Sequence, residues 1–288
     1  MDLCNIKTLE SLLKRHGFSF SHALGQNFIV DAAVCPRMAE LAGLDKGTGV
    51  LEIGPGVGVL TKELCARAGF VVAAEVDARL LPVLAETLRE CGNAEVVHAD
   101  ILKTDVNALL RDKFKGFTTV KVCANLPYYI TSPILMRLLE DCTGIDEIVV
   151  MVQKEAAERL CAGAGTKKTG AVSIAVAYRA ETEVLFDVGR ESFMPSPRVD
   201  SAVIRLKMRR EKMPLRDEKQ FFRTVRAAFS QRRKTAVNAI SSQLGVPKAA
   251  LSEAFAAAGI RPNARPEEMT MDEFAAAAEA VADLQKQA

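Results

Sequence analysis

The sequence lacks the patterns that accompany metal sites and disulfide frameworks. Its three histidines, at positions 16, 22 and 98, form no ligand or triad pattern, and its seven cysteines include no Cys-x-x-Cys pair. Dispersed cysteines in odd number are typical of reduced thiols in a cytosolic protein. We therefore predict no bound metal and a cytoplasmic location.

Long hydrophobic runs are also missing. No apolar stretch approaches the roughly 18 residues of a membrane span, and the N-terminus has no apolar signal-peptide core. With 288 residues, 49% of them hydrophobic, the chain can form one large domain and a smaller one. We expect a monomer that does not associate with membranes.

The small net charge of +2 conceals a basic segment. Between Arg205 and Lys234 there are twelve Lys or Arg and three Asp or Glu, so this stretch carries +9 and the rest of the chain −7. Such a local excess indicates a polyanionic partner. On the charge count alone, a solvated helical face explains it equally well.

Short apolar strands alternate with helical segments over most of the chain. Strands are predicted at 50–53, 71–76, 94–99, 120–124 and 147–152, followed by "EVLFDV" and "DSAVIRLKM", which we expect to be antiparallel at the sheet edge. This alternation predicts an α/β fold whose mostly parallel sheet has helices on both faces. Past Pro214 only helices are predicted, at 217–230, 233–243, 248–257 and 271–285. We predict two domains, at 1–213 and 214–288.

A glycine-rich loop, "VLEIGPGVGVLT", follows the first strand and opens a helix. Val59 occupies the third glycine position of the G-x-G-x-x-G fingerprint, which disfavours a dinucleotide cofactor. Glu75 ends the second strand, where it could accept both ribose hydroxyls, and Asp100 ends the third, near an adenine amino group. A tight turn would explain the loop alone. With both acids, it predicts an S-adenosylmethionine (SAM) pocket that includes Gly54 and Gly56.

The stretch "CANLPYYITSP" ends the fourth predicted strand at the rim where open α/β sheets bind ligands. The carboxamide of Asn125 and the backbone carbonyl of Leu126 could accept hydrogen bonds from an exocyclic amine, while Tyr128 stacks on the base. Phe193, in the proline-stiffened "FMPSPRVDS", is a candidate for the second face of the base. The expected chemistry is methyl transfer to a base amine, driven by positioning.

These motifs resemble those of the ribosomal RNA adenine dimethyltransferases of the KsgA type over nearly the whole chain. The resemblance rests on "LGQNFIVD" (24–31), "EIGPGVGVLT" (52–61), "EVD" (75–77), "NLPYYITSPIL" (125–135), "MVQKEAAERL" (151–160), "FMPSPRVDSAV" (193–203) and "FSQRRKT" (229–235). It implies a class I SAM-dependent methyltransferase with a Rossmann-like, seven-stranded sheet and a smaller helical domain that contributes to rRNA binding.

The resemblance also implies substrate and site residues. Family members dimethylate two adjacent adenines near the 3′ end of small-subunit (16S) rRNA in an assembling pre-30S particle. SAM contacts are implied for Asn27, Ile29, Gly54, Glu75, Asp100 and Asn125. Asn125, Leu126 and Tyr128 would handle the amine, with Phe193 holding the base.

The cations Arg232, Arg233 and Lys234 are expected at a helix N-terminus. There they would oppose the helix dipole, so a phosphate backbone explains them better than local stability does. A solvated turn is the alternative.

Two other functions fit part of the pattern. A 23S rRNA adenine methyltransferase of the macrolide-resistance type would share the SAM pocket and the N-L-P-Y turn, but "FMPSPRVDS" and the long helical C-terminal part favour the small-subunit enzyme. A non-catalytic RNA-binding assembly factor on this scaffold would be expected to have lost Glu75, Asp100 or the turn, and all are present. A dehydrogenase fails on glycine spacing.

Overall fold

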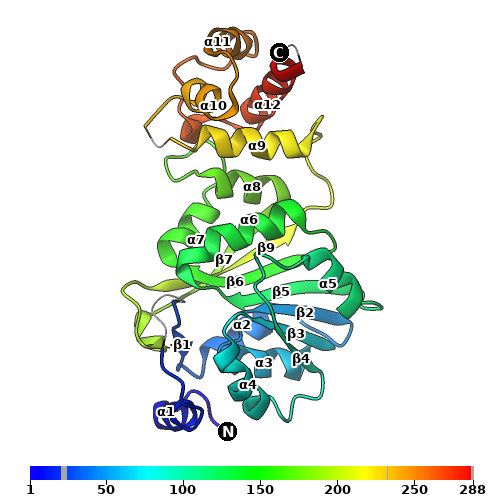
Figure 1. Ribbon diagram of the computed structural model, residues 1–288, viewed down its shortest axis with the longest axis vertical. Coiled ribbons are helices and arrows are strands. Elements are labelled where there is room, and N and C mark those ends of the chain that lie inside the picture. The colour runs from blue at the N-terminus through cyan, green and yellow to red at the C-terminus, as the bar shows by residue number, and fades with distance from the viewer. Residues whose placement is uncertain (21–24, 232, 287–288) are drawn as a thin grey trace. The chain divides into compact units, whose positions relative to one another are not determined.

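A computed structural model describes residues 1–20, 25–231 and 233–286, and it divides the chain into two compact units. The first, which we call the sheet unit, comprises Met1–Ala157 and Thr182–Met208. The second, the helical unit, comprises Glu158–Glu181 and Arg209–Ala288. Figure 1 shows the elements of both along the chain.

A seven-stranded sheet forms the centre of the sheet unit, in the order β4-β3-β2-β5-β6-β9-β7. Pairing is parallel from β4 to β6, and β9 runs antiparallel to β6. The strands are β2 (Thr48–Ile53), β3 (Phe70–Glu75), β4 (Ala94–His98), β5 (Thr119–Asn125), β6 (Glu147–Gln153), β7 (Ala180–Val188) and β9 (Ser201–Met208). The predicted α/β fold with a mostly parallel sheet is confirmed.

Both faces of the sheet are covered. Val50 and Leu51 point to opposite faces because side chains alternate along a strand, and neither has any exposed surface. On one face, apolar residues of α2 and α3 form a continuous core with Val50, Val71 and Cys123 of the strands. The helices of the sheet unit are α1 (Ile6–Arg15), α2 (Val34–Leu41), α3 (Val59–Arg67), α4 (Leu81–Thr87), α5 (Val106–Lys113) and α6 (Thr131–Asp141), with α7 (Lys154–Leu160) beginning in it.

A two-stranded ribbon joins parts of the chain that are distant in sequence. β1 (Phe28–Ile29) pairs antiparallel with β8 (Phe193–Met194), so that Ile29 lies opposite Phe193. The Val30 amide donates to the Ser192 carbonyl at 2.8 Å and extends the pairing by one bond. The "LGQNFIVD" and "FMPSP" motifs are therefore neighbours in the folded chain.

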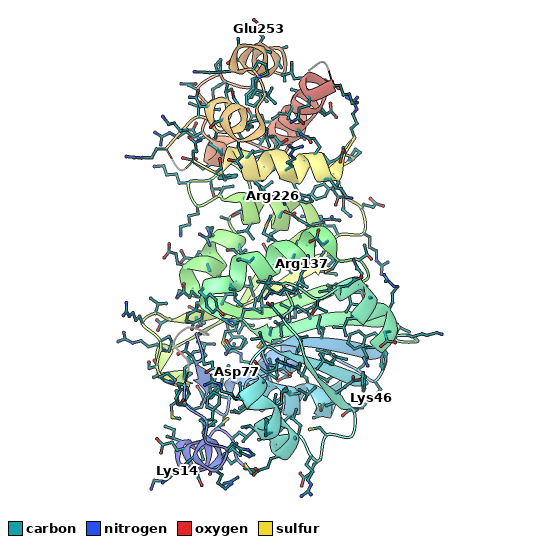
Figure 2. All side chains as sticks on the ribbon, viewed as in Figure 1. Lys14, Lys46, Asp77, Arg137, Arg226 and Glu253 are labelled. Atoms are coloured by element: carbon teal, nitrogen blue, oxygen red, sulfur yellow. The ribbon has the colours of Figure 1, made fainter. Side chains whose placement is uncertain are left out.

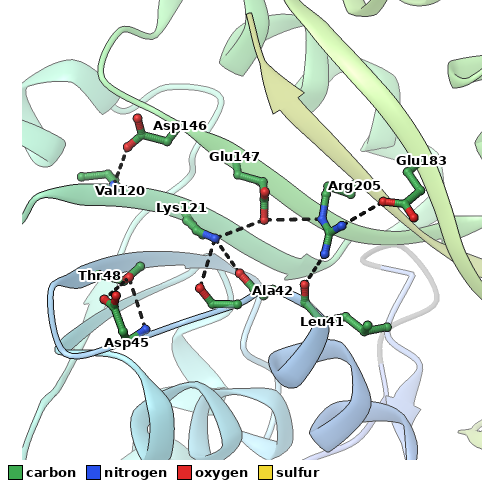
Figure 3. A network of polar contacts seen from close by, with 11 residues as sticks. Leu41, Ala42, Asp45, Thr48, Val120, Lys121, Asp146, Glu147, Glu183 and Arg205 are labelled. Carbon is green, nitrogen blue, oxygen red and sulfur yellow. Dashed lines mark hydrogen bonds and ion pairs between the residues drawn. The ribbon is translucent and has the colours of Figure 1, made fainter.

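Two cations from the sheet hold the C-terminal end of α2 (Figure 3). Lys121 of β5 donates to the Ala42 carbonyl at 2.6 Å, and Arg205 of β9 donates to the Leu41 carbonyl. Glu147 lies between them, with its carboxylate 3.3 Å from Lys121 Nζ and 3.7 Å from Arg205 Nε. The two side chains donate hydrogen bonds to the last carbonyls of the helix, and their positive charge complements the helix dipole. Since α2 follows β1 directly, these contacts also fix the segment that enters it.

Five α-helices lie entirely within the described residues of the helical unit. They are α8 (Ala171–Arg179), α9 (Glu218–Ala228), α10 (Ala236–Leu244), α11 (Lys248–Ala257) and α12 (Met271–Lys286). Residues 158–181 belong to this unit, in which Tyr178 of α8 packs against Phe221 and Phe222 of α9 with ring centroids 5.5 and 5.6 Å apart. The boundaries of the compact units thus differ from the predicted boundary between residues 213 and 214. The division into functional domains 1–213 and 214–288 stays a prediction.

The start of α10 differs from the expected helix at 233–243. Thr235 has extended backbone angles and its hydroxyl accepts from the Asn238 amide at 3.4 Å, so it is the N-cap. Arg233 and Lys234 therefore lie in the turn before the helix. None of the helices in the described part of the chain has the length and apolar character needed to cross a lipid bilayer.

We predict that Lys121→Met destabilises the protein by about 2 kcal/mol. The methionine retains the apolar stem but removes the ammonium, which leaves the Ala42 carbonyl and the half-paired Glu147 carboxylate without their donor, and unsatisfied partly buried groups cost about 1–3 kcal/mol. Denaturant-induced unfolding measures the change. The control is Lys115→Met at an exposed position, expected within about 0.5 kcal/mol of wild type. Equal midpoints for the two variants would contradict the role given to Lys121.

Candidate active site

The loop between β2 and α3 adopts left-handed backbone angles that favour glycine. Gly54 and Gly56 have φ of +70° and +60°. A Cβ on Gly56 would lie 3.1 Å from the Phe28 ring, so this glycine lets β1 approach the loop. A Cβ on Gly54 would meet no atom within 4 Å, and Gly54 lines a cavity at this edge of the sheet. The loop thus leaves open space beside the backbone at the N-terminus of α3.

Glu75 holds the same loop from the end of β3. Its carboxylate accepts from the Asp77 amide at 2.8 Å and from the Gly56 amide at 3.3 Å, and its residue is only 4% exposed. Burial raises the pKa of Glu75, and the two backbone amides partly offset the rise. Glu75 is among the residues that line the cavity, and its contact with ribose hydroxyls stays a prediction.

A second buried acid, Glu52, lines the cavity and was missed from the sequence. It is 1% exposed, and burial raises its pKa to about 8, with a further increase from nearby Glu75. The nearby Thr61 hydroxyl lowers the pKa of Glu52 in part, although its geometry is not that of a hydrogen bond. Glu52 Oε2 has no hydrogen-bond partner among the described residues. A lone acid inside the apolar strand "VLEI" was the available signal.

The N-L-P-Y turn begins where β5 ends. Asn125 Nδ2 donates to the Asn27 carbonyl at 3.4 Å, an assignment that makes Oδ1 the acceptor side of the carboxamide. The Leu126 amide donates to the Met151 carbonyl of β6 at 3.1 Å. Tyr128 starts a 3₁₀ turn, Tyr128–Ile130, and its hydroxyl lies 2.6 Å from Ser201 Oγ of β9. The turn is thus fastened to two neighbouring strands and to the N-terminal segment.

The cavity brings together most of the residues predicted from the sequence. Those that line it are Asn27, Ile29, Gly54, Gly56, Glu75, Asn125, Leu126 and Tyr128. Gln26, Glu52 and Tyr129 also line it and were not predicted. Because these residues come from the ends of adjacent strands and from the segment around β1, the arrangement combines the carboxyl edge of a parallel sheet with a wall from the N-terminus.

Four predicted residues besides Arg232 are not among those lining the cavity. Asp100 follows β4 and pairs with Lys103 at 3.3 Å, while the adjacent Ala99 amide bonds to the Glu75 carbonyl. Phe193 is 4% exposed and packs in the core beside Ile29. Arg233 and Lys234 are exposed in the helical unit, and Arg232 lies outside the described residues. The roles of these residues stay predictions.

The sheet order, the glycine loop and the acid ending β3 define a class I SAM-dependent methyltransferase. Open space at Gly54 and the unpartnered Glu52 oxygen fit a ligand that carries positive charge, as SAM does. Residues 17–283 match the family model described as "Ribosomal RNA adenine dimethylase". The chain belongs to the ribosomal RNA adenine dimethylase family.

Known relatives extend over almost the whole chain. It is 45% identical over 285 residues to the ribosomal RNA small subunit methyltransferase A of Geobacillus sp. (strain WCH70), covering 97% of this chain and 98% of that protein. The protein of the same name from Bacillus cereus (strain B4264) is 45% identical over 279 residues, 95% of each chain.

Two solved structures share the fold. The crystal structure of the 23S rRNA methyltransferase ErmE is 27% identical, with a TM-score of 0.62 over 88% of this chain and 99% of that one. A dimethyladenosine transferase from Plasmodium falciparum is 24% identical, with a TM-score of 0.67 over 87% of this chain and 95% of that one.

We predict that Glu52→Gln makes the ligand-free protein less sensitive to pH. The folded protein holds a proton on Glu52 that the unfolded chain releases above about pH 4.5. This proton therefore contributes to the free energy of unfolding of the wild type at low pH, and the contribution is lost as pH rises towards 8. At about 1.4 kcal/mol per pKa unit, the free energy of unfolding of the variant relative to that of the wild type should rise by roughly 2–4 kcal/mol between pH 5 and pH 8.

Denaturant unfolding at the two pH values measures this gain. Glu155→Gln, at an exposed position of α7, is the control and should change stability by the same small amount at both. A constant difference between Glu52→Gln and wild type would show that Glu52 is ionised throughout in the folded protein.

Proposed function

We propose that this protein dimethylates the exocyclic amine of two adjacent adenines near the 3′ end of small-subunit rRNA in an assembling particle, with SAM as methyl donor. The observation that supports the reaction best is the orientation of Asn125 in the cavity wall, where the Nδ2 bond to Asn27 leaves Oδ1 as acceptor. The substrate is supported by 45% identity to small-subunit methyltransferases over nearly the full length.

The turn provides two acceptors for one amine. An exocyclic nitrogen is a poor nucleophile because its lone pair is delocalised into the base. Asn125 Oδ1 and the Leu126 carbonyl would each accept one N–H, which favours a pyramidal nitrogen whose lone pair points away from the ring. The Tyr128 ring, held through its hydroxyl by Ser201, would lie against the base. Bound SAM would supply an electrophilic methyl group, and the residues here contribute position.

The buried acids suit the cofactor. Asn27, Ile29, Gly54, Gly56 and Glu75 would form its binding site, with Glu75 on the ribose. A cation placed near Glu52 would compensate the cost of burying its charge, so the carboxylate and the ligand would stabilise each other. The same Glu75 holds the Gly56 amide, so ribose binding and loop conformation are linked.

For RNA we propose a basic surface on the helical unit, formed by Lys219, Arg223, Arg233 and Lys234. Lys219 and Arg223 are one turn apart on the exposed face of α9, and Arg233 and Lys234 are exposed in the turn after it. Arg226, labelled in Figure 2, continues the same face. The basic segment also contains cations that pair with acids: Arg205 with Glu183, Arg209 with Glu181, Lys212 with Glu218 and Arg216 with Asp283.

The reaction is tested with small-subunit particles from cells that lack the adenine methylation. Wild-type protein and SAM should restore a primer-extension block at two adjacent adenines near the 3′ end. A block in 23S rRNA instead would identify the macrolide-resistance activity. RNA binding without methyl transfer at saturating SAM would exclude the enzymatic function and support a non-catalytic assembly factor.

We predict that Asn125→Ala lowers methyl transfer at saturating SAM by at least about 100-fold, because misplaced reacting groups cost on that order. Binding to particles should be unchanged. Asn263→Ala, at an exposed position of the helical unit, is the control and should retain wild-type turnover. If saturating SAM restored near-normal rates to Asn125→Ala, Asn125 would be a cofactor contact only.

We predict that Arg233→Ala with Lys234→Ala weakens binding to the particles and makes it less sensitive to salt. The slope of log affinity against log salt should fall by about 0.7–0.9 for each phosphate that the variant no longer neutralises. The control, Arg89→Ala with Lys115→Ala, removes the same charge from exposed positions of the sheet unit. Identical slopes for the two double variants would place the RNA-binding surface elsewhere.

A further inference from the structure

Two consecutive tyrosines of the cavity wall differ in environment. Tyr128 is partly buried and its hydroxyl is bound by Ser201. Tyr129, also part of the wall, is 56% exposed. Successive residues of a 3₁₀ turn point about 120° apart, so the Tyr128–Ile130 turn directs the two rings differently. Packing in the core explains neither the size nor the exposure of the Tyr129 ring.

The Tyr129 ring is supported on one side by the backbone of Gly25. A Cβ on Gly25 would lie 3.2 Å from Tyr129 Cδ1 and 3.8 Å from Pro127 Cβ, and Gly25 has a φ of +59°. The turn below the ring is fixed, since the Ile130 amide and the Thr131 hydroxyl both donate to the Pro127 carbonyl at 3.2 Å. The ring is therefore a supported, half-exposed aromatic surface at the cavity.

No other aromatic residue lining the described part of the cavity offers such a surface. Phe28 is 6% exposed and packs against Phe18 and Phe20. Tyr128 is partly buried with its hydroxyl bound by Ser201, and the proposed function already places its ring against the target base. Phe193, expected to hold a base, is 4% exposed in the core. The position that meets solvent beside the N-L-P-Y turn is occupied by Tyr129.

We propose that Tyr129 is a stacking platform for the nucleotide next to the target adenine. This inference rests on the proposed function. A base entering the cavity must leave its stack, and its neighbour is then left without a stacking partner. An exposed ring beside the entrance replaces that partner, and aromatic stacking accepts any base. Tyr129 would thereby hold the second of two adjacent adenines outside the cavity while the first occupies it.

The test compares Tyr129→Ala, Tyr129→Phe and wild type on undermethylated small-subunit particles with saturating SAM. Tyr129→Ala should raise the KM for particles about tenfold, as expected when one base no longer stacks on a ring, with kcat changed less. Tyr129→Phe should behave as wild type because it keeps the ring. SAM affinity, measured by calorimetry, should be unchanged in both. Val184→Ala, at an exposed apolar position of β7, is the control.

The outcomes separate this inference from the function on which it rests. An unchanged KM in Tyr129→Ala overturns the stacking role while methyl transfer by wild type still supports the proposed function. Equal defects in the Ala and Phe variants would assign the effect to the hydroxyl and also overturn it. Weaker SAM binding in Tyr129→Ala would overturn it as well, by making the ring part of the cofactor site. If wild type transfers no methyl group, the proposed function fails and the stacking role fails with it.

Discussion

Parallel pairing of β2 with β3 on one side and β5 on the other positions the groups of the site that follow these strands. Ile53 lies beside Ala74, and Glu52 beside Cys123, so the residues that follow each strand emerge at one edge. The Gly54 amide bonds to the Ala74 carbonyl at 2.9 Å, which extends this register into the glycine loop. Glu75 and Asn125, the last residues of β3 and β5, are placed by the same pairing. A slip of one residue would turn each of them to the opposite face.

The cavity wall contains two acids with little exposed surface. Glu52 and Glu75 are both almost fully buried, and the charge of Glu75 raises the cost of ionising Glu52. This environment favours a protonated Glu52 in the ligand-free protein, whereas a positive charge nearby would favour the carboxylate. A neutral ligand of the same shape would leave Glu52 protonated. A positively charged ligand would therefore gain an interaction with the wall that a neutral one lacks.

The sequence predicts those parts of the site that depend on local motifs. Gly54, Gly56, Glu75 and Asn125 stand at strand ends that the hydrophobic pattern locates, and all four line the cavity. Burial is set by distant contacts and was harder to foresee. Pairing of β8 with β1 places Phe193 in the core, which the sequence does not show, and its role in holding the base stays a prediction. The sequence does not distinguish Tyr129 from Tyr128, because only the 3₁₀ turn shows that the two rings point in different directions. Nor does it show that α8 packs against the helical unit through Tyr178.

The ribbon of β1 and β8 has a consequence for how the protein is made on the ribosome. β1 leaves the exit tunnel early, whereas its partner strand, Phe193–Met194, is synthesised after β2 to β6 are complete. During that interval the parallel strands can pair, but β1 has no partner strand, and the wall formed by residues 25–29 is held only in part. The wall of the cavity is thus completed late in translation. A nascent chain that stops before residue 193 has the glycine loop and the N-L-P-Y turn but lacks the strand that pairs with β1.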